Sequence, residues 1–320
     1  MLAPYPAAAV ERDQWILAQR AQRNALDPFR PYAFFCEDEC DASGDIQPVA
    51  TVFLTNRECP WRCAMCDLWK NTLTESVPIG AIPTQIDYAL NQLPTARAIK
   101  LYNSGSFFDP RAIPVEDYPA IAQRMNNFDR VIVECHPALV SERCVAFRDL
   151  IGGKLEVAMG LETAHPAVLE KLNKRMTLDQ FSKAVSFLRR HDIDLRVFIL
   201  VQPPFMRPNE ALHWAERSLD FAFDCGATAA SLIPTRGGNG AMESLASLGD
   251  FTPPSLACVE DALRYGLVIE RGRVFVDLWD LHRGAGCAHC YEPRIARLHA
   301  MNLEQKVLDP VTCDLCGAAA

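Results

Sequence analysis

Short apolar runs that recur along the chain from Val49 constrain its fold more than any other feature. Each run is followed by a longer amphipathic stretch, and this alternation is typical of strand–helix units that build a parallel sheet. We expect six strands, at residues 49–55, 98–102, 130–135, 155–159, 195–201 and 227–233, and one further candidate at 273–277. The predicted fold class is α/β. Six such units fit a partial barrel as well as a doubly wound sheet, and both place ligands at the carboxyl ends of the strands.

The stretches between these runs predict amphipathic helices. Thr177 and Gln180 have capping-box spacing at the start of one helix. Gly226 follows another, where a left-handed residue is needed to end it. The apolar faces expected from helical spacing are Ile79, Ile82, Ile86, Leu90 and Leu93; Leu178, Phe181, Val185 and Leu188; and Leu212, Ala215, Leu219 and Ala222.

The chain is expected to divide into three segments. Residues 1–47 form an N-terminal extension, with a helix at 10–22 and a proline-broken acidic stretch after it. Residues 48–245 form the sheet domain with its repeated units. Residues 246–320 form a C-terminal extension that ends in paired cysteines.

Composition excludes several classes of protein. With 49% hydrophobic and 22% charged residues the chain has enough apolar side chains for a large core, so disorder and fibres are excluded. No apolar run reaches the length of a membrane span, and Glu11, Arg12 and Asp13 stand where a signal peptide would be apolar. We therefore expect a cytoplasmic protein that binds no membrane. The formal net charge of −8 disfavours binding of nucleic acid by the whole surface but leaves a local basic groove open.

Three cysteines follow the first expected strand at intervals of four and three residues: Cys59, Cys63 and Cys66. Thirteen cysteines in a chain without an export signal indicate metal or cluster ligation rather than disulfides. Three thiolates on one loop can hold three irons of a cubane cluster and leave the fourth iron open, whereas a structural zinc site needs four protein ligands. The alternatives are a zinc knuckle that takes a ligand from elsewhere, or three packed thiols.

This cysteine loop resembles that of the radical SAM superfamily. The resemblance implies a partial (β/α)6 barrel of the TIM type, a 4Fe-4S cluster on the three cysteines, and S-adenosylmethionine at the open iron. It also implies reductive cleavage to a 5′-deoxyadenosyl radical, with electrons from a flavodoxin or ferredoxin-type donor. A barrel suits this chemistry because the radical must form beside its target, away from water. Met65 stands where the family has an aromatic residue against adenine, and a soft thioether is able to take that contact.

Two further segments carry the resemblance across about residues 49–240. Asn103, Ser104, Gly105 and Ser106 follow the second strand, where the family has a turn that receives the methionine amino group. Small residues there let backbone carbonyls approach an ammonium, and the serines add hydroxyl acceptors. Glu162 ends the fourth strand, where related enzymes bind the cofactor's ribose or amino group. The alternatives are an ordinary loop at 103–106 and a surface-exposed Glu162.

The branch resembled most is the one with the Elp3-type radical domain and the archaeosine synthase radical subunit, whose members act on transfer RNA. The segments that carry this are 104–107, 160–162, 172–174 and 203–205. Some members have a lysine before the paired prolines, where this chain has Gln202. No acetyltransferase domain fits in the remaining tail, so a full Elp3-like activity is not expected.

A second set of cysteines lies at the C-terminal end, as two CxxC pairs: Cys287 with Cys290, and Cys313 with Cys316. Four thiolates make a closed tetrahedral site, so a structural zinc is the first interpretation, and a second iron-sulfur cluster or independent thiols are the others. The basic residues between the pairs, Arg294, Arg297, His299 and Lys306 with Tyr291, either follow a phosphate backbone or form a solvated face.

The function expected from these features is a radical SAM enzyme that modifies a nucleoside in transfer RNA. The alternatives are a radical SAM enzyme acting on a small metabolite or peptide, and a non-catalytic metal-binding scaffold. Two weaker candidates complete the site: His136 after the third strand, for which a structural role is the other interpretation, and the glycine-rich loop 237–240, which could cradle a ribose.

Overall fold

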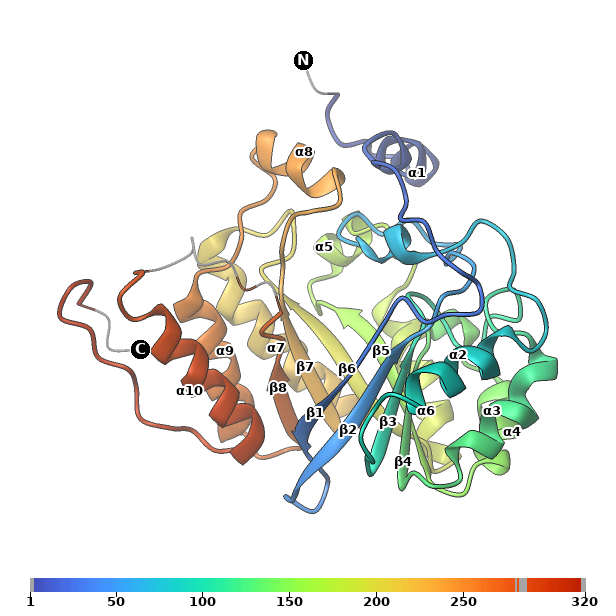
Figure 1. The fold of residues 1–320 in the computed structure, drawn as a ribbon. Coiled ribbons are helices and arrows are strands. Elements are labelled where there is room, and N and C mark those ends of the chain that lie inside the picture. Colours follow the sequence, from blue (N-terminus) through green and yellow to red (C-terminus); the bar gives the residue numbers. More distant parts are fainter. Residues whose placement is uncertain (1–2, 280, 282–286, 318–320) are drawn as a thin grey trace.

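The computed structural model describes residues 3–279, 281 and 287–317. Its centre is one curled sheet of eight strands in sequence order (Figure 1). β1 (Ala33–Cys40) and β2 (Ile46–Phe53) are antiparallel, and every later strand pairs in parallel with the one before it. The later strands are β3 (Ala98–Tyr102), β4 (Arg130–Glu134), β5 (Lys154–Glu162), β6 (Asp194–Val201), β7 (Ala229–Pro234) and β8 (Arg273–Val276). The expected partial barrel of parallel strands is confirmed, and the candidate at 273–277 is its last strand.

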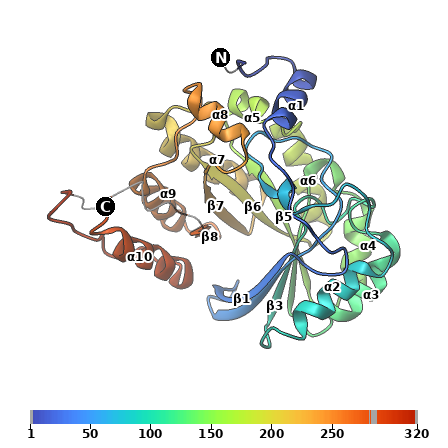
Figure 2. The same ribbon diagram turned by 45° about the horizontal axis from the view of Figure 1, so that its top comes forward.

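Helices cover the outer face of this sheet. In both views α9 and α10 lie beside β8, and α2, α3 and α4 lie on the opposite side (Figures 1 and 2). The α-helices are α1 (Ala9–Ala18), α2 (Ala81–Leu90), α3 (Tyr118–Met125), α4 (Glu142–Leu150), α5 (Pro166–Lys171), α6 (Leu178–Arg190), α7 (Ala211–Cys225), α8 (Ala241–Ser247), α9 (Leu256–Val268) and α10 (Tyr291–Glu304). Short 3₁₀ turns occupy Leu68–Asn71, Val115–Asp117, Pro137–Leu139 and Pro208–Glu210. Across the described residues, no helix combines the length and apolar character of a membrane span.

Both predicted helix caps are confirmed, whereas one predicted helix face includes a residue outside the helix. The Thr177 hydroxyl accepts a hydrogen bond from the backbone N–H of Gln180, and the Gln180 side chain accepts one from Thr177 N–H, which completes the capping box of α6. Gly226 ends α7 with φ +109°, a conformation that few side chains tolerate. Ile79 was wrongly placed on a helix face, because α2 begins after Gly80 and Ile79 is 68% exposed.

β1 is a strand that the sequence analysis missed. Its second half is acidic and was taken for part of the N-terminal extension, yet Glu37 and Glu39 alternate with Asp38 and Cys40 at strand spacing. Lys100 binds both glutamates, with its Nζ 3.1 Å from Glu37 and 2.7 Å from Glu39. An acidic strand forms here because its glutamates make ion pairs with buried cations of the other strands.

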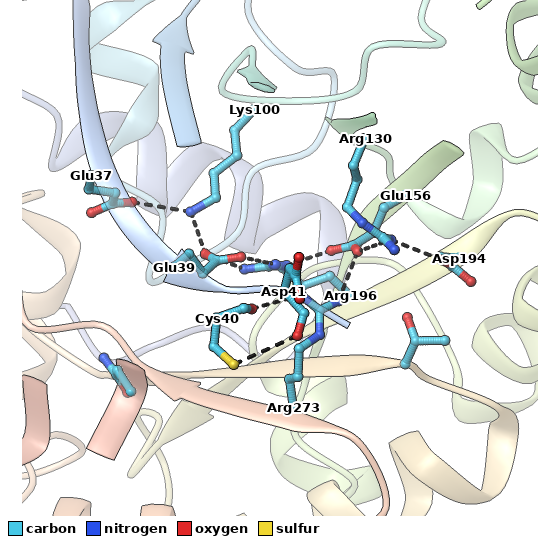
Figure 3. A network of polar contacts seen from close by, with 12 residues as sticks. Glu37, Glu39, Cys40, Asp41, Lys100, Arg130, Glu156, Asp194, Arg196 and Arg273 are labelled. Atoms are coloured by element: carbon cyan, nitrogen blue, oxygen red, sulfur yellow. Dashed lines mark hydrogen bonds and ion pairs between the residues drawn. The ribbon is translucent and has the colours of Figure 1, made fainter. Parts of the chain in front are cut away.

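Those cations belong to a charged layer inside the half-barrel, near the amino ends of the parallel strands (Figure 3). Glu156 of β5 is completely buried and accepts hydrogen bonds from Arg130 of β4, Arg196 of β6 and Arg273 of β8. Burial opposes the ionisation of Glu156, but the three arginines outweigh it and lower its pKa to about 2. The layer therefore closes the end of the barrel opposite to the ligand end with paired charges.

The two edges of the sheet approach each other through side chains. Arg273 of β8 donates from Nη1 to the backbone carbonyl of Cys40 at the end of β1, at 3.2 Å. Phe35 of β1 stacks on Trp279, which follows β8, with ring centroids 5.3 Å apart. The ladder itself ends at β1 and β8 in the described chain, so these contacts join the edges without backbone pairing.

Candidate active site

The loop that follows β2 carries Cys59, Cys63 and Cys66, and two segments distant in the chain, at residues 172–173 and 239, hold it in place. Leu172 accepts a hydrogen bond at its carbonyl from the backbone N–H of Ala64, at 2.9 Å. Asn173 donates from its side chain to the carbonyl of Arg62, at 2.7 Å. Asn239 donates to the carbonyls of Ala64 and Cys66, at 2.8 and 3.1 Å. These hydrogen bonds pair the backbone carbonyls of Arg62, Ala64 and Cys66, which would face water in a mobile loop. The segments after β5 and β7 therefore fix the conformation of the cysteine loop.

Apolar contacts seat the same loop under α1 and α8. Ala64 is fully buried in a cluster with Trp15 and Ile16 of α1 and Met242 of α8. Met65 is half-buried and packs against this cluster and against the one that includes Leu172 and Leu200. Figure 1 shows both helices at one end of the sheet, above the cysteine loop. The thiols therefore lie at the carboxyl end of the strands, beneath a cover of apolar residues.

The three cysteines are half-buried. Burial raises the pKa of Cys59 to about 11 and that of Cys66 to about 12, and raises the pKa of Cys63 well above its ordinary value. All three are free, and the positive charge of Lys174 favours the thiolates of Cys59 and Cys63. Three soft donors on one loop, with no fourth protein ligand on that loop, suit three irons of a cubane cluster better than a closed zinc site.

The turn after β3 offers a polar side chain that the fold does not use. Asn103 is fully buried, and among the described residues neither its amide nitrogen nor its amide oxygen has a hydrogen-bond partner. A Cβ on Gly105 would lie 3.2 Å from the Cβ of Cys59, so a glycine lets this turn approach the cysteine loop. A buried amide without partners costs free energy unless a ligand pairs with it. The turn therefore fits a ligand that carries both donors and acceptors, as the amino and carboxylate groups of methionine do.

The serines of this turn already have protein partners. The Ser104 hydroxyl lies 3.0 Å from the hydroxyl of Tyr32, and the Ser106 hydroxyl donates to Sγ of Cys135 at 3.5 Å. Ser104 also has φ +55°, a conformation uncommon for a residue with a side chain. Asn103 and the backbone of the turn are consequently the stronger candidates for ligand contact.

Glu162 is buried at the end of β5 and is not the surface residue of the alternative interpretation. It stands at a register shift in the β5–β6 ladder with φ +67°, and its carboxylate forms an ion pair with Nζ of Lys174. A Cβ on Gly160 would collide with both members of this pair, so only glycine leaves room for it. A strained backbone that presents a buried ion pair beside Cys63 is typical of a functional site.

Comparison with known proteins agrees with this geometry. No family model matches the chain. It is 24% identical over 259 residues to an uncharacterized protein of Methanocaldococcus jannaschii, covering 76% of this chain and 71% of that protein. It is 25% identical over 226 residues to archaeosine synthase subunit beta of Methanosarcina acetivorans, covering 67% of this chain and 65% of that one.

Among solved structures, the archaeal Elp3 of Methanocaldococcus infernus superposes with a TM-score of 0.51 at 15% identity, over 68% of this chain and 59% of that one. Elp3 is also the protein whose radical domain the sequence analysis named as a resemblance. The chain has the radical SAM fold. The resemblance named from the cysteine loop is confirmed, although at this identity it establishes the fold and not the substrate.

Several residues of this candidate site escaped the sequence analysis. Glu134, at the end of β4, accepts a hydrogen bond from the backbone N–H of Asn103 at 2.7 Å, and its pKa is raised to about 7 because burial outweighs the donors of the turn. Lys174 and Asn239 are the others, and Asn239 lies in the glycine-rich loop that was expected to cradle a ribose. Glu134 ends a strand, and Lys174 and Asn239 lie in the segments 172–174 and 237–240 that the sequence analysis names. The sequence did not assign these residues a role, because each acts on a partner distant in the chain.

His136 has the structural role that was the other interpretation. Its ring stacks on Trp61 of the cysteine loop with centroids 3.6 Å apart, and its two nitrogens contact the backbone of Lys174 and Ala138. Burial and the nearby charge of Lys174 lower the pKa of His136 to about 3, so the ring is neutral. It supports the cysteine loop by packing.

The four C-terminal cysteines come together as expected for a metal site. One sulfur from each of Cys287, Cys290, Cys313 and Cys316 lies within 4.8 Å of the others. The basic residues between the pairs do not form a phosphate-binding face as a group, because Arg294 and Arg297 are buried against Glu260. This part of the expected RNA signal was wrong: the arginines attach α10 to α9.

Proposed function

We propose that this protein is a radical SAM enzyme that modifies a nucleoside in transfer RNA. One observation supports the catalytic part most: three half-buried cysteines on one loop lie beside a turn whose Asn103 amide has no partner in the described chain. Cys59, Cys63 and Cys66 would hold a 4Fe-4S cluster. With S-adenosylmethionine on the open iron, that cluster supplies reductive cleavage to a 5′-deoxyadenosyl radical.

The residues around the loop have distinct tasks in this proposal. Asn103 and the backbone at Gly105 would bind the methionine amino and carboxylate groups, and Met65 would lie against adenine. Glu162, whose orientation is fixed by Lys174, would accept from the ribose or the amino group. Ser104 and Ser106 would shape the turn through Tyr32 and Cys135 rather than contact the ligand. The apolar residues of α1 and α8 would exclude water from the reacting atoms.

Transfer RNA is proposed as the substrate because two of the proteins similar to this chain are archaeosine synthase subunit beta and Elp3. The chain matches about two thirds of that subunit's length, so the substrate remains our proposal. Electrons would come from a flavodoxin or ferredoxin-type donor, and the protein would work in a reducing compartment such as the cytoplasm, where thiolates stay available to metals.

Anaerobic reconstitution tests the chemistry. The chain loaded with iron and sulfide, then given dithionite and S-adenosylmethionine, should release 5′-deoxyadenosine. Cys63→Ala should lose the cluster absorption and the release together, while Cys225→Ala, a matched change outside the loop, should keep both. If the loaded wild-type chain releases none, or if Cys63→Ala retains its biological role, the protein is a metal-binding scaffold and not this enzyme.

Mass spectrometry of nucleosides tests the substrate. Transfer RNA from cells with and without the protein should differ in one modified nucleoside, and complementation with the Cys63→Ala variant should not restore it. An unchanged nucleoside profile, together with 5′-deoxyadenosine release in the purified system, would instead support a small metabolite or a peptide as the substrate.

We infer that the C-terminal cysteines hold a single zinc ion. Sγ of Cys290 and Sγ of Cys316 lie 3.8 Å apart, and two ligands at about 2.3 Å from one tetrahedral ion are separated by about that distance. A cubane cluster needs more space, since each thiolate binds a different iron. Metal analysis of a Cys59→Ala, Cys63→Ala, Cys66→Ala triple variant should find one zinc per chain and no iron. Iron and sulfide in that variant would favour a second cluster.

A further inference from the structure

A hollow rich in arginine lies on the outer side of the cysteine loop. It has a volume of about 420 Å³, and the charged residues that line it are Arg23, Arg57, Arg62, Arg111 and Glu58. Four arginines against one glutamate leave a formal charge of +3 on this hollow, in a chain whose net charge is −8. A concentrated positive charge on an acidic protein marks a place where an anion is received.

Glu58 orients the arginines rather than cancelling them. Its carboxylate lies 2.7 Å from Nη1 of Arg20 and 3.1 Å from Nη1 of Arg62, and it also binds Arg23. One buried carboxylate therefore fixes three guanidinium groups, which reduces the entropy lost when they bind an anion.

Two arginines of the hollow are not bound by Glu58, and only Arg111 has a carboxylate partner among the described residues, Asp109, which accepts from its Nε and Nη2. Arg57 is half-buried, and its side chain forms no ion pair with any described residue. Arg111 follows the turn at 103–106, and its side chain is 54% exposed while Asp109 holds it at 3.1 Å. Both come from loops at the carboxyl end of the strands, and Arg57 is two residues from Cys59.

We propose that this hollow binds a backbone phosphate of the RNA substrate and so positions the target nucleoside at the mouth of the barrel. The inference rests on the proposed function and adds the contact that holds the polynucleotide. All four cations are arginines, whose planar forks match phosphate oxygens in pairs. A concave site of this size suits a protruding phosphodiester better than the flat surface of an acidic protein partner.

Binding of a transfer RNA transcript at several salt concentrations tests the proposal. The Arg57→Gln, Arg111→Gln double variant should bind about tenfold more weakly near 0.1 M salt, and the slope of log affinity against log salt should fall by about 2. The matched control is Arg97→Gln, Arg271→Gln, which removes the same charge from arginines that precede β3 and β8 at the opposite end of the sheet. This control should keep the wild-type affinity and slope. Iron content and thermal unfolding, measured on each variant, verify that the cysteine loop and the fold are intact.

Three results would overturn the inference. If the wild-type chain binds the transcript and the Arg57→Gln, Arg111→Gln variant binds it equally well, the hollow has no part in RNA binding, although the proposed function stands. If that variant keeps its RNA affinity but loses affinity for reduced flavodoxin, the hollow receives the acidic electron donor. If the wild-type chain itself does not bind the transcript but releases 5′-deoxyadenosine, RNA as the substrate class is wrong as well.

Discussion

At the scale of single residues, the site is marked by side chains that the fold does not need. Asn103 is completely buried, yet its amide has no partner in the described chain, whereas the amide of Asn239 donates to two carbonyls and accepts from Met242. Both are asparagines beside the same loop. Their contacts predict different effects of substitution by alanine. At Asn103 the change should weaken ligand binding, and at Asn239 it should loosen the cysteine loop.

Replacement of Asn103 by alanine should weaken binding of S-adenosylmethionine about tenfold in the cluster-loaded protein, since a hydrogen bond to a charged ligand group is lost. The free energy of unfolding should fall by no more than about 1 kcal/mol, because no protein hydrogen bond is removed. Calorimetric titration and denaturant unfolding measure the two quantities. A large loss of stability with unchanged affinity would mean that Asn103 is a structural residue.

The sequence predicted the roles of some site residues and not of others. Cys59, Cys63 and Cys66 were found because their spacing is local, and Glu162 because it ends a strand. Lys174 was not assigned a role, because its partner Glu162 is twelve residues away and only the bend of the chain between β5 and α6 brings them together. The serines of the turn were expected to face a ligand, and the sequence held no sign of Tyr32 and Cys135 as their partners.

At the scale of elements, the cysteine loop depends on loops from distant parts of the sheet. Asn239 lies 175 residues beyond Ala64, and Asn173 lies 111 residues beyond Arg62. Hydrogen bonds to the carbonyls of a ligand loop orient its thiols in the same way as outer contacts orient metal ligands. The loop should therefore lose its metal before the barrel loses its fold.

We expect Asn239→Ala to reduce the affinity for the cluster about tenfold, the usual effect of removing an outer contact of a metal site. Iron release to a chelator, followed by absorbance under anaerobic conditions, measures this. Asn302→Ala is the matched control, since that side chain bonds to the backbone of Val276 on β8 and not to the loop. Equal iron release from both variants would contradict the assigned role of Asn239.

Elements were predicted well where the apolar pattern was long. The parallel strands and the helices α6 and α7 followed from spacing and caps. β1 could not be found in this way, because half of it is acidic and its partners Lys100 and Arg196 lie 61 and 157 residues away from Glu39. Local sequence shows hydrophobic periodicity. It does not show which charged residues of distant strands will lie opposite a strand after folding.

At the scale of the whole molecule, the charged layer joins the two edges of the sheet. Replacing Arg196 by methionine should destabilise the protein by about 3–5 kcal/mol, because it leaves two buried carboxylates, Glu39 and Glu156, without a main partner. Denaturant unfolding measures the effect. Arg190→Met, an exposed position on α6, is the control and should change stability by less than about 0.5 kcal/mol. A similar small change in Arg196→Met would mean that the layer does not hold the fold.

The same layer predicts how stability responds to acid. The pKa of Glu156 is lowered to about 2 in the folded protein, against about 4.3 for an unfolded chain. Its contribution is therefore complete above about pH 5 and is lost as the pH falls toward 2. The free energy of unfolding, measured from pH 7 to pH 3, should fall in the lower half of this range. In Glu156→Gln the fall should be shallower, and an identical slope would contradict the assignment.

The side-chain contacts between β1 and β8 have an evolutionary consequence. Where hydrogen-bonded backbone closes a barrel, the width is set by strand number and stagger, so it changes only in large steps. Here side chains join the β1 and β8 edges: Arg273 on one side, and the ring pair of Phe35 with Trp279 on the other. The length of these side chains sets the distance between the two edges. A shorter or longer side chain at one of these positions would change the width of the half-barrel in small steps. Descendants of this scaffold could thus accommodate bulkier or slimmer targets through point mutations, while every strand keeps its register.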